Sequence, residues 1–313
     1  MKKRFKMIGV VTVLLFVLAA CSTKDPGTGD SEDAEKGSGN GTIKIGLSIS
    51  TLNNPFFVTL RDGAEKAANE KGFELVTSDA QDDPSTQLSD IEDLLQQDID
   101  ALLVNPVDSE AIVSAVELAN NADIPVITVD RSSEGGEVAA HIASDNVEGG
   151  KMVGEFIAEQ LGEEGKVVEL EGIPGASATR ERGQGFHEIV DDMDGIEIVA
   201  NQTANFDRTE GLSVMENIIQ STDQIDAVFA HNDEMALGAL EALEAKGVSD
   251  VIVVGFDATD DAVEAVEGGR MDATIAQKPE LIGESAIETA EKVVKGEKVE
   301  EFIPVELELI TPD

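Results

Sequence analysis

From Ile43 onward, short apolar segments alternate with longer segments of helical period, and this alternation most constrains the fold. Apolar, β-rich segments predict strands at 43–49, 73–77, 101–104, 126–129, 167–170, 197–201, 227–230, 251–254 and 274–276. Amphipathic helices are expected between them, among others at 55–71, 86–97, 109–121, 147–161, 209–220 and 235–246. Such a pattern favours α/β architecture with parallel sheets covered on both faces. The strands are too many for one standard sheet, so we expect two doubly wound parallel-sheet domains.

The two halves of this pattern resemble each other weakly. The segment 102–105 ends in Asn105 before a helix, as 228–232 later ends in Asn232. Likewise 126–130 ends in Asp130, and 253–257 ends in Asp257. Open α/β sheets bind ligands beyond the carboxyl ends of their strands. We therefore expect polar groups from both halves to meet in one cleft between the domains.

Several catalytic signatures are missing from the sequence. It contains no glycine-rich dinucleotide fingerprint, phosphate loop, G-x-S-x-G turn or Cys/His metal set. The three histidines, His141, His187 and His231, are scattered, and structural roles are expected for them. We therefore expect a protein that is not an enzyme and that holds no cofactor and no metal.

Polar residues follow successive predicted strands, and their types suit hydroxyl groups. Carboxylate and amide oxygens accept the proton of an alcohol, while guanidinium and amide N–H groups donate to its oxygen. Phenylalanines lie beside them in the sequence, and sugar C–H faces pack well on aromatic rings. Each residue alone would pass for a helix cap or a core residue, but together they indicate a polyol site. The polar residues are Ser50, Asn54, Asn105, Asp130, Arg131, Asn232, Asp257 and Gln277, and the aromatic ones are Phe56, Phe57, Phe206 and Phe256.

These residues lie in blocks that resemble the bacterial periplasmic sugar-binding proteins of ABC importers, in particular those that bind D-ribose. The resemblance runs from about Ile43 to the C-terminus. The blocks are 50–57, 105–106, 125–131, 141–146, 180–183, 205–208, 232–238 and 254–257.

The resemblance implies a fold and a role for each residue. It implies the periplasmic binding protein type I fold, with an N-terminal lobe at 43–144 plus 278–306, a C-terminal lobe at 145–277 plus 307–313, and three hinge crossings. Phe57 and Phe206 would enclose the sugar ring, with Phe56 at its edge. Ser50, Asn105, Ser144, Ile173 and Phe256 would line or support the pocket. The sugar hydroxyls would bond to Asp130, Arg131, Arg182, Asn232, Asp257 and Gln277, with help from Asn54.

The N-terminal residues predict export and anchoring. Residues 1–6 are basic and 7–20 are apolar, too short for a bilayer span, which needs about 20 residues. The run ends in Leu18-Ala19-Ala20-Cys21, which resembles a bacterial lipobox. We expect a lipoprotein signal peptide at 1–20, lipidation of Cys21, and a flexible acidic tether at 21–42. The protein would then be extracytoplasmic, held at the cell membrane by the lipid alone.

The charge balance limits the partners. The chain has 64 acidic and 22 basic residues, a formal net charge of −42. Nucleic acid would repel such a body, so none is expected as a partner. The acidity is typical of a surface suited to salty or alkaline surroundings, while an acidic docking face remains an alternative. The expected partners are D-ribose and an ABC transporter permease, with a chemoreceptor left open, and the expected state is a monomer.

Three alternatives remain. The sensing core of a sugar-responsive repressor shares this fold, but a signal peptide stands where a DNA-binding motif would be. An enzyme acting on sugars or nucleosides would turn its ligand over. A different sugar, such as allose, galactose or a furanosyl signal molecule, would keep the class of function and change the ligand.

Overall fold

The computed structural model describes residues 42–312. The predicted signal peptide, Cys21 and the tether up to residue 41 therefore lie outside the described residues. The elements, in chain order, are β1 (Lys44–Ile49), α1 (Pro55–Lys71), β2 (Glu74–Asp79), α2 (Pro84–Leu95), β3 (Ala101–Val104), α3 (Val113–Asn121), β4 (Val126–Val129), β5 (Ala140–Ser144), α4 (Asn146–Leu161), β6 (Gly165–Glu171), α5 (Ser177–Val190), β7 (Ile196–Thr203), α6 (Arg208–Ser221), β8 (Ala227–Ala230), α7 (Asp233–Lys246), β9 (Ile252–Asp257), α8 (Asp260–Glu267), β10 (Ala273–Ala276), α9 (Pro279–Val294), β11 (Phe302–Val305) and β12 (Glu308–Ile310).

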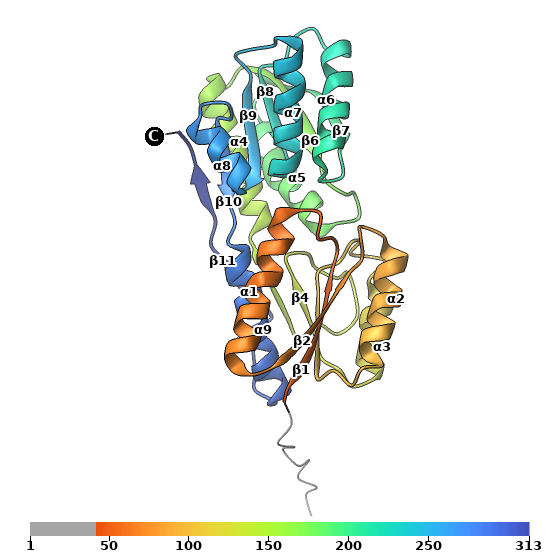
Figure 1. Cartoon of the computed structure of the whole chain (residues 1–313). Helices are drawn as coiled ribbons and strands as arrows, with labels where there is room; N and C mark the ends of the chain where they lie inside the picture. Colours follow the sequence, from red (N-terminus) through yellow and green to blue (C-terminus); the bar gives the residue numbers. More distant parts are fainter. Residues whose placement is uncertain (1–41, 313) are drawn as a thin grey trace, which may run out of the picture. The chain divides into compact units, whose positions relative to one another are not determined.

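The strands form two six-stranded sheets (Figure 1). The first has the order β11-β5-β4-β3-β1-β2 and is parallel throughout. The second has the order β12-β10-β9-β8-β6-β7, and only its edge strand β12 is antiparallel. This confirms the predicted fold class of two doubly wound sheets.

The chain passes between the sheets at three places: after β5, after β10 and after β11. We call the first sheet with α1, α2, α3 and α9 the N-terminal lobe, and the second sheet with α4 to α8 the C-terminal lobe. The residue boundaries predicted for the lobes, at 144/145, 277/278 and 306/307, stay a prediction.

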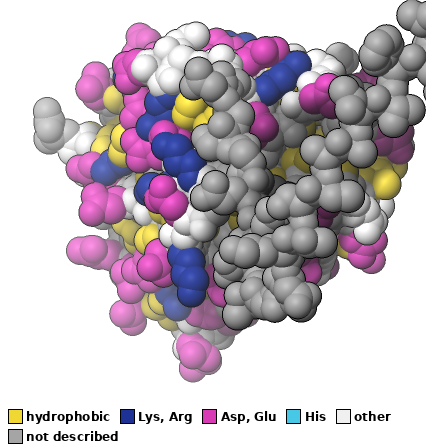
Figure 2. All heavy atoms as spheres, turned by 90° about the horizontal axis from the view of Figure 1, so that it is seen from below, with side chains coloured by type: hydrophobic (Ala, Val, Ile, Leu, Met, Phe, Trp, Pro, Cys, Tyr) yellow, Lys and Arg dark blue, Asp and Glu magenta, His cyan; other side chains and the backbone are white. Residues whose placement is uncertain are grey.

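The outward surface is strongly acidic. In the view of Figure 2, Asp and Glu side chains are numerous over the part that is not grey, and Lys and Arg lie among them. Some basic groups join helices: Lys66 Nζ of α1 lies 2.9 Å from Glu280 Oε1 and 2.8 Å from Glu284 Oε1 of α9. Such exposed pairs contribute only about 0–1 kcal/mol each.

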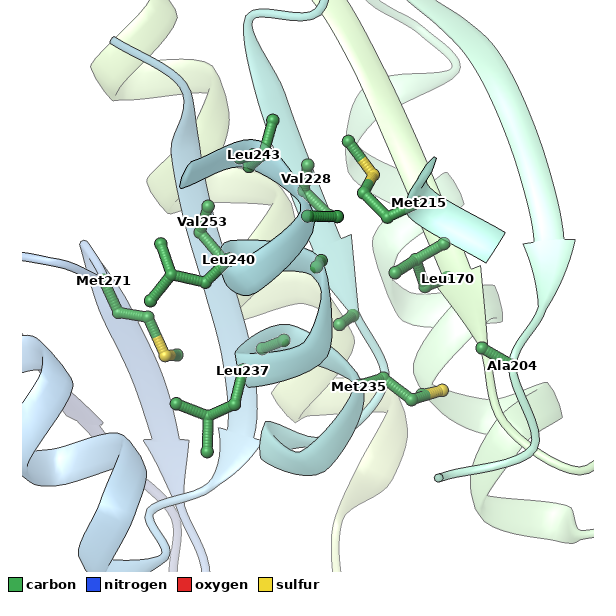
Figure 3. Packing of buried hydrophobic residues seen from close by; sticks show 14 of the residues in the cluster. Leu170, Ala204, Met215, Val228, Met235, Leu237, Leu240, Leu243, Val253 and Met271 are labelled. Atoms are coloured by element: carbon green, nitrogen blue, oxygen red, sulfur yellow. The ribbon is translucent and has the colours of Figure 1, made fainter. Parts of the chain in front are cut away.

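Both faces of each sheet are covered by helices. In the C-terminal lobe, Leu237, Leu240 and Leu243 of α7 pack against Leu170, Val228 and Val253 of the sheet (Figure 3). Phe186 of α5 and Phe229 of β8 belong to the cluster on the opposite face. The N-terminal lobe has the same two-sided arrangement, with α1 and α9 on one face and α2 and α3 on the other. The cores thus fix the strand ends from which the site is built.

Candidate functional site

One pocket between the lobes collects most of the predicted site residues. The lining residues are Asn54, Phe56, Phe57, Asp130 and Arg131 from the N-terminal lobe and Ala178, Arg182, Phe206, Asn232, Asp257 and Gln277 from the C-terminal lobe. None of the predicted residues among them is more than 8% exposed. The pocket is therefore almost fully enclosed by side chains of both lobes.

Strand ends and helix starts place these groups. Asp130 and Gln277 directly follow β4 and β10, and Asp257 ends β9. Asn54 and Asn232 cap α1 and α7, because their side-chain oxygens accept from the backbone N–H groups of Phe56 and Met235. Polar groups at the carboxyl ends of parallel strands therefore converge, as the sequence pattern predicts.

Two buried ion pairs lie in the pocket. Arg131 Nε is 3.6 Å from Asp130 Oδ2, and Arg182 Nη1 is 3.8 Å from Asp257 Oδ1. Burial raises the pKa of Asp130 despite the nearby Arg131, and burial also raises the pKa of Asp257 well above its ordinary value. Burial lowers the pKa of Arg131. Two carboxyl groups and two guanidinium groups balance in formal charge, so the pocket suits an uncharged polar ligand.

The aromatic rings enclose the guanidinium groups. The Arg131 Cζ atom lies 5.0 Å from the Phe57 ring centroid and 5.1 Å from that of Phe206. The Arg182 Cζ atom lies 3.9 Å from the centroid of Phe256, which lies outside the pocket lining. Such cation–π contacts hold a charged group over a ring and stabilise it by about 0.5–2 kcal/mol.

Hydrogen-bonding capacity remains unused in the pocket. Gln277 Nε2 donates to Asp257 Oδ1 at 2.9 Å, but Gln277 Oε1 has no partner among the described residues. Arg131 Nη1 donates to the Pro106 carbonyl at 3.1 Å, and Arg131 Nε has no hydrogen-bond acceptor within that part of the chain. A free acceptor and a free donor are what a hydroxyl group requires.

Four of the remaining predicted residues lie outside the pocket lining. Asn105 Nδ2 donates to Asp130 Oδ2 at 3.2 Å, and Asn105 Oδ1 accepts from the Ser50 backbone N–H. Ser50 and Ser144 are buried, and in the described structure their hydroxyl oxygens have no partner. Ile173 packs against the core of the C-terminal lobe. Among these four residues, Asn105 is the one with a hydrogen bond to a lining residue, Asp130.

One lining residue, Ala178, was not among the predicted site residues. It lies in α5, a helix that the apolar spacing did not reveal, and an alanine carries no chemical signal. Within residues 42–312 no group of three or more His, Cys, Asp or Glu side chains could hold a metal ion.

Hydrogen bonds and an ion pair also join the two lobes outside the pocket lining. The Ser132 backbone N–H donates to Ser177 Oγ at 2.9 Å, and the Ser177 backbone N–H donates to Ser109 Oγ at 3.1 Å. Arg180 pairs with Glu134. Residues near 109 and 132 of the N-terminal lobe thus bond to the start of α5 in the C-terminal lobe.

The chain is similar to known proteins in both sequence and fold. A model of the periplasmic binding protein domain matches residues 45–298. The ribose import binding protein RbsB of Bacillus subtilis is 52% identical over 99% of this chain and 99% of its own length. The protein of the same name from Haemophilus influenzae is 55% identical over 85% of this chain and 91% of its own length. A solute-binding protein of an ABC transporter from Bacillus halodurans, solved with myo-inositol, is 39% identical with a TM-score of 0.84, and the match covers 88% of this chain and 96% of that one.

Proposed function

Because the chain belongs to the periplasmic binding protein family, we propose that it captures D-ribose between its two lobes and delivers the sugar to an ABC importer. The single observation that carries this proposal is the pocket: a charge-balanced, enclosed set of hydroxyl-binding groups from both lobes. The relatives named ribose import binding proteins support the choice of sugar.

Closure of the lobes follows from the shared pocket. A sugar that contacts both lobes binds the closed arrangement better than an open one and shifts the hinge equilibrium toward it. In the closed arrangement the pocket groups are out of contact with bulk water. A sugar with an inverted hydroxyl then leaves a buried charged partner without its bond, which costs about 1–3 kcal/mol or more. The importer would recognise the closed protein.

Calorimetry against a panel of sugars tests the ligand. Ribose should bind with one-to-one stoichiometry, and arabinose and xylose should bind at least tenfold more weakly, about 1.4 kcal/mol. myo-Inositol, allose and galactose belong in the panel because the fold binds other polyols. Tighter binding of any of these than of ribose would reassign the ligand, and turnover of any sugar would show an enzyme.

The proposed location is the outer face of the cell membrane, with Cys21 as the lipid-bearing residue. Leu18-Ala19-Ala20-Cys21 at the end of an apolar run supports this. Cys21→Ser should release the protein into the medium and leave ribose affinity unchanged, because residues 42–312 contain the whole pocket. A variant that stays in the washed membrane fraction would contradict the anchor and leave the sugar assignment intact.

A further inference from the structure

A buried carboxylate lies one layer behind the sugar pocket. Glu169 on β6 is completely buried. Its Oε1 atom is 2.9 Å from His231 Nε2, and its Oε2 atom is 3.0 Å from His187 Nε2 and 2.6 Å from Asn201 Nδ2. The carboxylate thus joins α5, β7 and the loop after β8. A buried carboxylate without partners would be costly, and three donors offset that cost.

The charges around Glu169 agree with an ionised carboxylate. Burial raises its pKa, but hydrogen bonds from His187 and His231 outweigh that effect and bring the pKa to about 2. The hydrogen bond to Glu169 in turn raises the pKa of His187 to about 9, with help from Asp191, whose Oδ1 is 2.8 Å from His187 Nδ1. His231 Nε2 must carry a proton, because a carboxylate can only accept.

Two links lead from this carboxylate to the pocket. Arg182 Nη1 donates to the backbone carbonyl of His231 at 2.6 Å. His231 therefore bonds both to Glu169, through its ring, and to the sugar-binding guanidinium, through its carbonyl. The next residue, Asn232, lines the pocket. Arg182 and His187 lie on the same helix, and a Cβ atom on Gly183 between them would be 3.5 Å from Glu169 Oε1. Glu169 therefore contacts both helix α5, which carries Arg182, and the loop after β8, whose His231 carbonyl accepts a hydrogen bond from Arg182.

We propose that Glu169 is a positioning residue for sugar binding: by holding His231 and His187 it fixes the Arg182 guanidinium in the pocket. This inference rests on the proposed function. A buried ion pair often adds little to stability compared with apolar residues of similar size, so a role in stability alone explains the network poorly. A fixed guanidinium presents its N–H groups to a hydroxyl without first losing conformational freedom.

The first test is Glu169→Gln, which keeps the side-chain shape and removes the charge. Ribose affinity should fall about tenfold, the loss expected when one charge-assisted hydrogen bond is broken. Glu171→Gln is the matched control, because Glu171 lies on the same strand and its side chain accepts from Asn201 but, among the described residues, from neither histidine. Equal affinity of the parent and Glu169→Gln would overturn the proposal.

The second test asks whether the effect passes through Arg182. In an Arg182→Lys background, Glu169→Gln should weaken binding less than it does in the parent, because contacting residues couple. His231→Leu, which lacks a donor, should behave like Glu169→Gln, and His231→Gln, which keeps an N–H group, should retain most of the affinity. Full additivity, or parental affinity in His231→Leu, would contradict a positioning role.

A third readout needs no sugar. The Arg182 Nη1–H resonance should shift or broaden in Glu169→Gln, since Nη1 donates to the His231 carbonyl that Glu169 helps to hold, and remain unchanged in Glu171→Gln. The pKa of the His187 imidazole should be lower in Glu169→Gln than in the parent, because only Asp191 would remain to raise it. An unchanged Arg182 signal would overturn the inference even if the parent bound ribose. A parent that binds no ribose, together with a shifted Arg182 signal, would overturn the proposed ligand and keep the role of Glu169.

Discussion

Three of the pocket residues have unusual backbone conformations. Asp130 has φ 62°, Phe206 has φ 61° and Asp257 has φ 120°. Residues other than glycine adopt such values rarely, at a cost of about 1–3 kcal/mol. Around Asp257 the local structure is held from behind, because the Ala258 backbone N–H donates to Thr274 Oγ1, which itself donates to the buried Asp233. The backbone beside Asp257 is thus held by contacts within the protein itself.

Substitutions in the pocket should show how much of the ribose affinity comes from charged side chains and how much from ring packing. Arg182→Ala and Asp257→Ala should each weaken ribose binding by several kcal/mol, because each leaves a buried partner unpaired. Phe206→Ala should cost about 1–3 kcal/mol through lost ring contacts. Calorimetry measures each value, with Arg61→Ala and Phe302→Ala as controls outside the pocket. Parental affinity in all three pocket variants would show that the sugar binds elsewhere.

The network around Glu169 predicts a pH dependence of stability. The pKa of His187 is raised to about 9, so its contribution is complete below about pH 6.5 and is lost as pH rises through 9. The pKa of Glu169 is lowered to about 2, so its contribution is complete above about pH 4.5 and is lost as pH falls through 2.

Urea unfolding at several pH values measures this dependence. The free energy of unfolding should fall between pH 6.5 and 9 more in the parent than in His187→Gln. Burial raises the pKa of Asp233 to about 7, so this residue also lowers stability as pH rises toward 7. Because Asp233 is present in both the parent and His187→Gln, the difference between these proteins reports on His187. Identical pH profiles of the two proteins would contradict the ion pair between His187 and Glu169.

At the scale of elements, helices with local start and stop signals were predictable. The helix expected at 55–71 is confirmed at both ends, because Asn54 and Pro55 start it and Gly72, at φ 70°, ends it. The helix expected at 109–121 begins only at Val113. Asp108 Oδ1 accepts from the backbone N–H groups of Glu110 and Ala111, and a turn replaces the first helical residues.

Elements that depend on distant contacts were not predictable from apolar spacing. Helix α5 contains Gly183 and Gly185, which weaken a helix in isolation. Its stability comes from close packing on α4, where a Cβ atom on Gly150 would lie 2.1 Å from the Arg182 carbonyl oxygen. Strands β11 and β12 are short edge strands that pair with β5 and β10 from far along the chain. Arg182 was found through resemblance, since no strand-end pattern marks it, and nothing in the local sequence singled out Glu169.

The packing of α1 on α9 gives a prediction at this scale. A Cβ atom on Gly283 would lie 2.1 Å from the Leu60 carbonyl oxygen and 2.7 Å from the Ala64 nitrogen. Gly283→Ala should therefore lower stability by about 1–3 kcal/mol, because the helices must separate. Glu288→Ala, at an exposed position of the same helix, should leave the melting temperature nearly unchanged. A Gly283→Ala variant as stable as the parent would show that the two helices separate freely.

The large negative net charge of the protein opposes compact folding. The net charge of −42 would become −46 on removal of residues 1–20, and 64 acidic residues far outnumber the basic partners. Self-repulsion should weaken the folded state at low ionic strength. Salt shortens the screening length from about 30 Å at 0.01 M to about 3 Å at 1 M.

The melting temperature should therefore rise clearly with sodium chloride up to 1 M. Ribose affinity should change much less, because the sugar is neutral and its partners are buried. Calorimetric scans and titrations across the salt series measure both quantities. A melting temperature that stays level or falls would mean that the acidity does not limit stability.

The three passages of the chain between the sheets have a consequence for folding during synthesis. The N-terminal lobe takes its last strand, β11, from Phe302–Val305 and one of its covering helices from Pro279–Val294. A nascent chain that has emerged only as far as β10 therefore cannot complete the lobe with which it began. Since α9 packs against α1, the apolar face of α1 stays partly uncovered until translation is nearly over. Such delayed completion ties the folding of the first lobe to the last part of synthesis.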